Sequence, residues 1–259
     1  MLPRERTDFV EVDQSVGLAD TVVHREDGLF DVPQAGMEAA LTLVGYYADM
    51  IAERRARPAG SDGGPGDLTS ALLAADIDGD RLTDDEIIGF LFLMVVAGNE
   101  TTTKLLSNAW LWGARNPDQL AKPLADPGRV PDWVEETLRY DTSTQMLLRL
   151  TRQPVCVQGV DIEAGRRVLL LVGSANRDEA VFENPDVYDL DRDTQNLISF
   201  GGGRHFCMGA ALARMEARIA LRELVTRVKQ YDIDEDGLVR VHSINVRGLA
   251  VLPTTVTLR

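Results

Sequence analysis

The sequence predicts a mainly α-helical protein with a minor β portion. A long helical stretch runs from about residue 83 to 116, and a second one of about twenty residues follows a glycine-rich run. The C-terminal tail alternates apolar and polar residues in places, which is typical of strands. With 259 residues and 44% hydrophobic content, the chain has enough apolar side chains for one sizeable core.

The first helices are predicted from the spacing of apolar residues and from loop-forming and helix-capping residues. Apolar residues recur at helical intervals between residues 37 and 51: Met37, Leu41, Val44, Tyr47 and Ile51. The stretch 56–67, ARPAGSDGGPGD, is a loop by composition, and DLTSALLAA after it reads as a short helix. Thr83 and Glu86 then form a capping box, which marks a helix start.

From this cap the helical pattern continues to about Asn116, roughly 33 residues, or about 50 Å at 1.5 Å per residue. Its middle, LMVVAG at 93–98, is apolar on every face, which predicts a buried central helix. Further on, we expect a helix over 131–140, a hairpin turning at Gln158-Gly159, a strand over 166–172 and a helix over about 209–230.

The net charge, the length of the apolar runs and the number of cysteines argue against several classes of protein. A net charge of −14 disfavours a general nucleic-acid binder, because phosphates would repel it. The longest apolar run, IIGFLFLMVVAG, is too short to span a membrane, and the N-terminus lacks a signal-peptide pattern. Two cysteines do not make a disulfide framework. We therefore expect a soluble, cytoplasmic protein.

The stretch FGGGRHFCMG places Cys207 between a run of glycines and a predicted helix. A thiolate is favoured at a helix N-terminus, and glycines let the backbone approach a ligand closely. The cysteine could thus be a metal ligand, a nucleophile, a redox thiol or a packed side chain.

Spacing tests these alternatives. A phosphate loop needs Gly-Lys-Ser/Thr, and a phosphatase-type nucleophile needs His directly before Cys; neither pattern is present. A structural zinc site needs about four ligands, whereas His205 and Cys207 supply two. A Cys-His hydrolase would need His205 to reach back along its own loop. The interpretation of Cys207 as a packed side chain remains open.

The pattern Phe200-x-x-Gly203-x-x-x-Cys207-x-Gly209 resembles the haem-binding loop of the cytochrome P-450 monooxygenases. Three more segments agree with this family in chain order. AGNETT, Ala97 to Thr102, resembles its oxygen-activation segment in the long helix. Glu136-x-x-Arg139 resembles its Glu-x-x-Arg pair, and NPDVYDLDR resembles the segment that supplies a second arginine, here Arg192.

The resemblance implies a role for each matching residue. Cys207 would be the axial ligand of the iron in haem b, iron protoporphyrin IX. Glu100 and Thr101 would be catalytic and would deliver protons. Arg149 and His205 would bind the haem propionates through charge-assisted hydrogen bonds. The other implied haem contacts are Phe200, Gly203, Gly209, Ala97 and Gly98. Glu136, Arg139 and Arg192 would form a structural triad.

The resemblance also implies a function: a soluble, bacterial-type monooxygenase that inserts one atom of O2 into a small apolar organic substrate. Electrons would come from NAD(P)H through a reductase and a ferredoxin. Val96, Ala97 and the segments 142–147 and 245–249 match pocket-lining positions. A row of arginines, Arg214, Arg218 and Arg222, is either a solvated face or a docking patch for the acidic ferredoxin.

We expect one partial cytochrome P-450 domain over 1–259, with 1–34 poorly defined and 35–259 matching the family's central and C-terminal part. Family members are longer, and the Trp-x-x-x-Arg propionate contact has no match here. The fold expected is therefore a P-450 fold that lacks its N-terminal portion. The alternative function is a truncated, catalytically inactive fragment that binds haem weakly or not at all.

Overall fold

The computed structural model describes residue 15 and residues 17–25, 31–56 and 67–259. Most of the stretch 1–34, expected to be poorly defined, lies outside these residues. The chain divides into two compact units, 1–100 and 101–259, which are treated separately below. Helix α4 (Asp84–Arg115) crosses from the first unit into the second. The prediction of one partial domain that matches from residue 35 stays a prediction.

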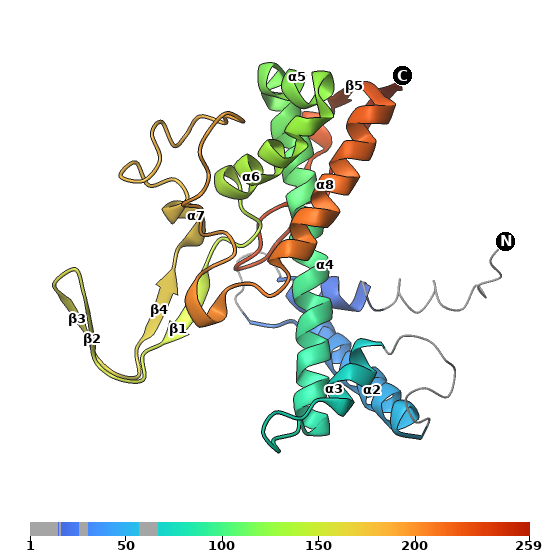
Figure 1. Cartoon of the computed structure of the whole chain (residues 1–259), viewed down its shortest axis with the longest axis vertical. Coiled ribbons are helices and arrows are strands. Elements are labelled where there is room, and N and C mark those ends of the chain that lie inside the picture. Colours follow the sequence, from blue (N-terminus) through green and yellow to red (C-terminus); the bar gives the residue numbers. More distant parts are fainter. Residues whose placement is uncertain (1–14, 16, 26–30, 57–66) are drawn as a thin grey trace. The chain divides into compact units, whose positions relative to one another are not determined.

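The described part of the first unit is mainly helical. Residues 17–23 are helical, followed by α2 (Gln34–Ala56), α3 (Leu68–Ala74) and the first half of α4 (Figure 1). The predicted helix 37–51 lies within α2 and is confirmed. The core of this unit contains Leu43, Tyr47, Ile51, Ile87 and Leu91.

Helix α4 begins at the predicted capping box. The Thr83 amide donates to the Glu86 carboxylate at 2.8 Å, and the Glu86 amide donates to the Thr83 hydroxyl at 3.3 Å. The helix then runs without interruption for 32 residues. The prediction that 93–98 is buried on every face is wrong, because Leu93 is 60% exposed. Only the side of α4 that carries Ile87 and Leu91 joins the core of the first unit.

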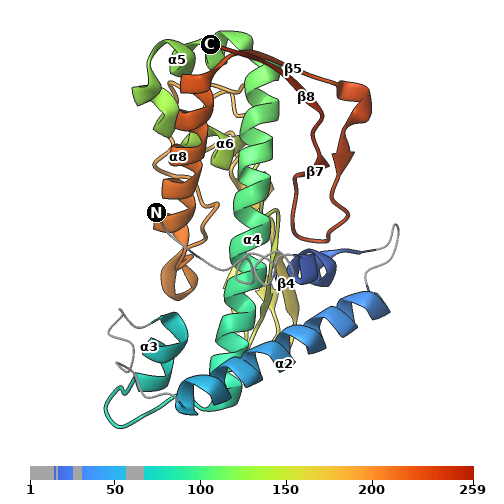
Figure 2. The same cartoon turned by 90° about the vertical axis from the view of Figure 1, so that its right-hand side faces the viewer.

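The second unit is built on the end of α4 together with α5 (Pro117–Ala125), α6 (Val130–Tyr140) and α8 (Ala210–Arg227). Figures 1 and 2 show α8 running beside the end of α4 and beside α6. Trp110 stacks on Tyr231 with ring centres 3.7 Å apart, and Trp133 lies 6.4 Å from Trp110. These aromatic rings fill the core between the helices.

The strands of the described residues form four two-stranded antiparallel ribbons. They pair β1 (Leu147–Leu150) with β4 (Arg167–Leu170), β2 (Val155–Val157) with β3 (Val160–Ile162), β5 (Val228–Ile233) with β8 (Thr254–Leu258), and β6 (Val239–Arg240) with β7 (Leu249–Val251). Short helical turns lie at α7 (Val172–Ala175), η1 (Pro127–Arg129), η2 (Gly203–His205) and η3 (Glu235–Gly237).

The predicted hairpin is confirmed. Gln158 and Gly159 have φ angles of 47° and 81° between β2 and β3, as a two-residue type I′ turn requires. The strand predicted over 166–172 is shorter, because α7 begins at Val172. The helix predicted to residue 230 ends at Arg227. Val228 and Tyr231 bury their side chains from β5 instead.

Candidate functional site

Cys207 lies at the junction between a tight loop and helix α8. Gly201 and Gly203 have φ angles of 70° and 62°, in the left-handed region that favours glycine. The Cys207 amide donates to the Phe200 carbonyl at 2.9 Å, and the Cys207 carbonyl accepts from the Ala210 amide at 3.2 Å. The main chain on both sides of the cysteine is therefore fixed by hydrogen bonds.

The surroundings of Cys207 suit a flat apolar ligand. Its thiol is free and exposed, and the neighbouring Phe206 and Met208 are exposed as well, Met208 to 69%. A Cβ atom added to Gly202 or Gly203 would meet no heavy atom within 4 Å. The described residues contain no group of three or more His, Cys, Asp or Glu that could hold a bare metal ion. One cysteine sulfur beside open glycines and apolar side chains fits the iron of a haem, which brings its own four nitrogen ligands.

The two residues expected at the haem propionates lie on separate elements of the second unit. His205 ends the 3-10 turn η2 two residues before Cys207, and its side chain is exposed. Arg149 lies in β1 opposite Val168 and is half-buried; its guanidinium donates to the Leu148 carbonyl at 3.0 Å. Both side chains can therefore be reached by an anionic ligand.

The expected oxygen-activation residues occupy consecutive turns of α4. Ala97 and Gly98 are exposed, Glu100 is buried, and Thr101 is half-buried. The helix has no break at Gly98. Glu100 ends the first unit and Thr101 begins the second. The hydroxyl of Ser143, a residue that the sequence did not single out, donates to the Thr101 carbonyl at 2.8 Å.

The segments 142–147 and 245–249, both expected to line a pocket, lie side by side. Thr144 pairs with Val246 as an antiparallel bridge. The Gln145 amide donates to the Asn245 carbonyl at 2.8 Å. The structure therefore joins two segments that are a hundred positions apart in the sequence.

A buried carboxylate that the sequence analysis missed holds this pair of segments to α4. Asp141 accepts from Trp112 Nε1 at 2.8 Å and from Arg247 Nε at 2.8 Å. Asn108, fully buried on α4, donates to the Asp141 carbonyl at 2.9 Å. Nothing in the spacing of these residues reveals their meeting, because 106 positions separate Asp141 from Arg247.

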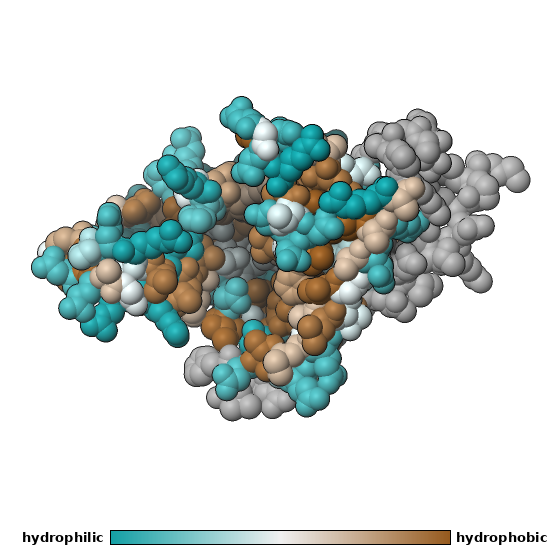
Figure 3. All heavy atoms as spheres, turned by 90° about the horizontal axis from the view of Figure 1, so that it is seen from below, coloured by the Kyte–Doolittle hydropathy of each residue, from teal (hydrophilic) through white to brown (hydrophobic). Residues whose placement is uncertain are grey.

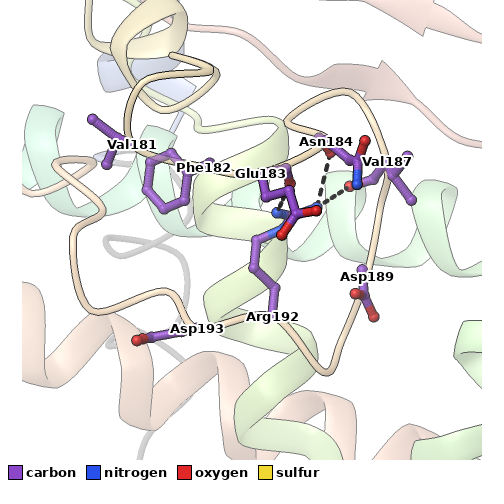
Figure 4. Close-up of a pocket in the computed structure, with 8 residues that line it drawn as sticks. All are labelled: Val181, Phe182, Glu183, Asn184, Val187, Asp189, Arg192 and Asp193. Atoms are coloured by element: carbon purple, nitrogen blue, oxygen red, sulfur yellow. Dashed lines mark hydrogen bonds between the residues drawn. The ribbon is translucent and has the colours of Figure 1, made fainter.

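The three residues expected to form a structural triad lie together. Arg139 binds both oxygens of Glu136, at 2.8 and 2.7 Å, and both side chains are buried. Arg192 Nε lies 3.5 Å from Glu136 Oε1. The Arg192 guanidinium also donates to the carbonyls of Asn184, at 2.9 Å, and Val187, at 3.1 Å (Figure 4). Glu136 thereby fixes the irregular segment that follows α7.

This chain is similar to known proteins. The cytochrome P-450 family model matches residues 130–254, which include the triad and the Cys207 loop. A putative cytochrome P-450, number 123, of Mycobacterium tuberculosis is 57% identical over 93% of this chain and 59% of its own length. The chain belongs to the cytochrome P-450 family.

Other cytochrome P-450 proteins are also similar to this chain. Cytochrome P-450 107B1 of Saccharopolyspora erythraea is 42% identical over 85% of this chain and 54% of its own length. The crystal structure of CYP109E1 from Bacillus megaterium in complex with corticosterone is 35% identical, with a TM-score of 0.81. The match covers 98% of this chain and 66% of that one. This P-450 chain thus spans somewhat more than half the length of the curated relatives it matches. None of its described helices is long and apolar enough to cross a membrane.

Two cavities of this P-450 are lined in part by charged side chains. A cavity of about 430 Å³ lies beside Arg192, whose side chain crosses it toward Glu183 and Asn184 (Figure 4). It is lined by Val181, Phe182, Glu183, Asn184, Val187, Asp189, Arg192 and Asp193. The nearby carboxylate of Asp191 is hydrogen-bonded by Lys122 and Arg129, which holds its pKa below the usual range.

The second cavity, of about 440 Å³, lies between α6, α8 and the segment before Cys207. Two arginines of the row described above, Arg214 and Arg218, line this cavity. Arg214 binds both oxygens of Glu135, at 2.7 and 2.9 Å, and Arg218 reaches the same carboxylate at 3.3 Å. Arg222 is exposed. The row is therefore not a uniform solvated face, because two of its members are paired with Glu135.

Proposed function

We propose that this chain is the haem-thiolate part of a cytoplasmic, bacterial-type P-450 monooxygenase, with Cys207 as the axial ligand of haem b. The observation that supports this most is the exposed, free thiol on a loop that turns at two left-handed glycines and is closed by a hydrogen bond to Phe200. When bound, haem would supply the redox chemistry that inserts one atom of O2 into a small apolar substrate.

The chain's own residues would hold the cofactor. A Cβ atom at Gly203 would meet no heavy atom within 4 Å, and one at Gly209 would meet only the Cys207 sulfur, at 3.9 Å, so both glycines would let the loop approach the ring. The exposed apolar side chains next to Cys207 would cover its edge. His205 and Arg149 would neutralise the propionates. Phe200, Ala97 and Gly98 complete the set of proposed haem contacts.

Glu100 and Thr101 would handle protons. A buried carboxylate next to a hydroxyl on a helix can hold a proton and pass it through ordered water, which is general acid–base catalysis. Ser143 supports this role, because its hydrogen bond to the Thr101 carbonyl adds a second restraint to the helix at this residue.

The substrate would be small and apolar. The paired segments 142–147 and 245–249, together with Val96 and Ala97, would line its pocket, and Met146, Leu147, Val246 and Leu249 give this lining apolar side chains. CYP109E1, which is similar over nearly all of this chain, binds corticosterone in its crystal structure. That relative supports an apolar substrate class and does not name the compound used here.

The electrons would come from NAD(P)H through a reductase and a ferredoxin-type protein. An acidic donor would be repelled by a chain of net charge −14 unless it met a local positive surface. Arg222 and the exposed part of Arg218, on the helix that follows Cys207, would supply that surface.

The second candidate is a catalytically inactive fragment with weak or no haem binding. Large apolar side chains reach the surface of both units, as the brown areas of Figure 3 show for one face. Exposed examples are Leu41, Leu93, Leu148, Leu150, Met208 and Ile219. This exposed apolar surface favours a chain whose haem site is only partly covered.

Haem titration separates the two candidates. The purified chain is mixed with haemin, and the spectrum of its reduced, CO-bound form is recorded. We expect a thiolate-type Soret band that Cys207→Ser abolishes. Cys156→Ser is the matched control, since Cys156 is also exposed but lies on β2. Stoichiometric uptake with this band supports the first candidate, whereas no haem signal supports the fragment. A band that survives Cys207→Ser shows that the ligand assignment is wrong.

A further inference from the structure

We propose that Glu135 and Arg214 are positioning residues for the Cys207 loop and that they act through the ring of Phe200. The importance of that loop rests on the proposed function, but the contacts themselves involve only residues of the second unit.

The first step is a bidentate ion pair between two helices. Arg214 on α8 donates from Nε and from a terminal nitrogen to the two carboxylate oxygens of Glu135 on α6, at 2.7 and 2.9 Å. Both side chains are mostly shielded from solvent. This geometry fixes the plane of the guanidinium, which a single hydrogen bond would leave free to turn.

The second step is the contact between that plane and Phe200. The guanidinium carbon of Arg214 lies 4.4 Å from the centre of the Phe200 ring, within the range of a cation–π contact. Phe200 packs against the core of the second unit and also lines the 440 Å³ cavity, so core atoms do not enclose it on every side. Arg214 therefore restrains a ring that would otherwise have room to change its rotamer.

The third step leads from Phe200 to the cysteine. The Phe200 carbonyl accepts the hydrogen bond of the Cys207 amide at 2.9 Å and so closes the glycine loop. Gly201 and Gly203 inside that loop have wide conformational freedom, so its shape depends on the residues at its two ends. A fixed Phe200 therefore gives a fixed Cys207.

Hydrogen exchange on the complete chain without haem tests this directly. Arg214→Lys keeps the charge but loses the planar fork. We expect the amide of Cys207 to exchange about tenfold faster in this variant, while amides in the middle of α6 keep their protection. Arg227→Lys is the matched control, since Arg227 pairs with Glu223 at 2.7 Å on the same helix but in an exposed position. Equal exchange at Cys207 in Arg214→Lys and the parent chain would overturn the proposal.

Two further variants test the route through the ring. The exchanged pair Glu135→Arg with Arg214→Glu restores an ion pair between the helices but places no cation over Phe200, so we expect the fast exchange to persist. Full recovery of protection would show that the pair only ties the helices together. In a Phe200→Leu background we expect Arg214→Lys to add less than a twofold change. An undiminished tenfold effect there would exclude the ring as the link.

The exchange rate of the Cys207 amide tests the positioning role independently of haem binding. A chain that binds no haem still reports the exchange rate of Cys207, so failure of the proposed function would leave the positioning test intact. Where haem is taken up, we expect Arg214→Lys to lower the fraction of the thiolate-type CO band, with Arg227→Lys unchanged. A loop that loosens without loss of this band would overturn the link between position and ligation.

Discussion

The hydroxyl of Ser143 donates a hydrogen bond to the main-chain carbonyl of Thr101 at 2.8 Å. Ser143 is buried, and its own carbonyl accepts the amide of Arg247 at 2.7 Å. Through its hydroxyl and its main-chain carbonyl, this one residue therefore joins the proposed catalytic residue of α4 to the two segments proposed to line the substrate pocket. A helix carbonyl that accepts a second bond is held in place more tightly than its neighbours.

Replacing the Ser143 hydroxyl should lower the stability of the chain by a measurable amount. We expect Ser143→Ala to lower the free energy of unfolding by about 1 kcal/mol, the usual net value of one hydrogen bond. Thr226→Ala is the control, because the Thr226 hydroxyl makes a similar bond to the Glu223 carbonyl at 2.9 Å in an exposed position. Urea titration of both variants measures the difference. Equal losses in the two variants would show that the Ser143 bond adds no special restraint.

The Glu136–Arg139 pair should behave very differently from an exposed pair of the same spacing. Arg139→Gln leaves the buried Glu136 without its bidentate partner, which costs about 3–5 kcal/mol. Arg166→Gln breaks the exposed Glu163–Arg166 pair, also at i,i+3, and should cost less than about 1 kcal/mol. Urea titration compares the two. A small loss in Arg139→Gln would mean that water or Arg192 replaces the missing partner.

Local sequence signals predicted the elements well. The capping box at Thr83, the turn at Gln158-Gly159 and the helix before Tyr140 depend on neighbouring residues only, and the structure has all three. Burial could not be inferred in the same way. The segment 93–98 is apolar on every face, but the packing of the first unit decides which of these faces meets a core.

In the candidate site, too, local patterns could be predicted from the sequence, whereas contacts between distant segments could not. The resemblance of short segments to the P-450 family pointed to Cys207 and to the Glu136–Arg139 pair. Contacts between distant segments gave no such signal: Asp141 meets Arg247, and Glu135 meets Arg214, only because helices and loops pack in one particular way. Acidic and basic residues are common enough that such a pairing cannot be distinguished in the sequence from two solvated charges.

Two glycines of α4 should respond to alanine in opposite directions. A Cβ atom at Gly98 would meet no heavy atom within 4 Å, so Gly98→Ala should stabilise the helix by about 0.5–1 kcal/mol. A Cβ atom at Gly113 would lie 2.7 Å from the Tyr231 hydroxyl and 2.9 Å from Trp133, so Gly113→Ala should destabilise the chain by about 1–3 kcal/mol. Thermal unfolding compares them. If Gly98 also approaches haem, Gly98→Ala should take up less haem while being the more stable protein.

Alkaline pH should unfold the chain partly through Tyr188. The Thr137 hydroxyl donates to the Trp133 carbonyl at 2.7 Å, so the Tyr188 hydroxyl, 2.7 Å from Thr137, must be the donor in that contact. Burial raises the pKa of Tyr188 well above its ordinary value, and it raises the pKa of Tyr231 as well.

Because the folded state holds these protons more tightly, their stabilising contribution is complete below about pH 10, the pKa of an unfolded tyrosine. It is lost as pH rises above that value, at about 1.4 kcal/mol per pH unit for each tyrosine. We expect Tyr188→Phe to make the fall in unfolding free energy between pH 10 and 12 shallower by that amount. The double variant with Tyr231→Phe should reduce the slope twice as much. Urea titrations at a series of pH values measure these slopes, and an unchanged slope in Tyr188→Phe would show that Tyr188 ionises as readily in the folded chain as in the unfolded one.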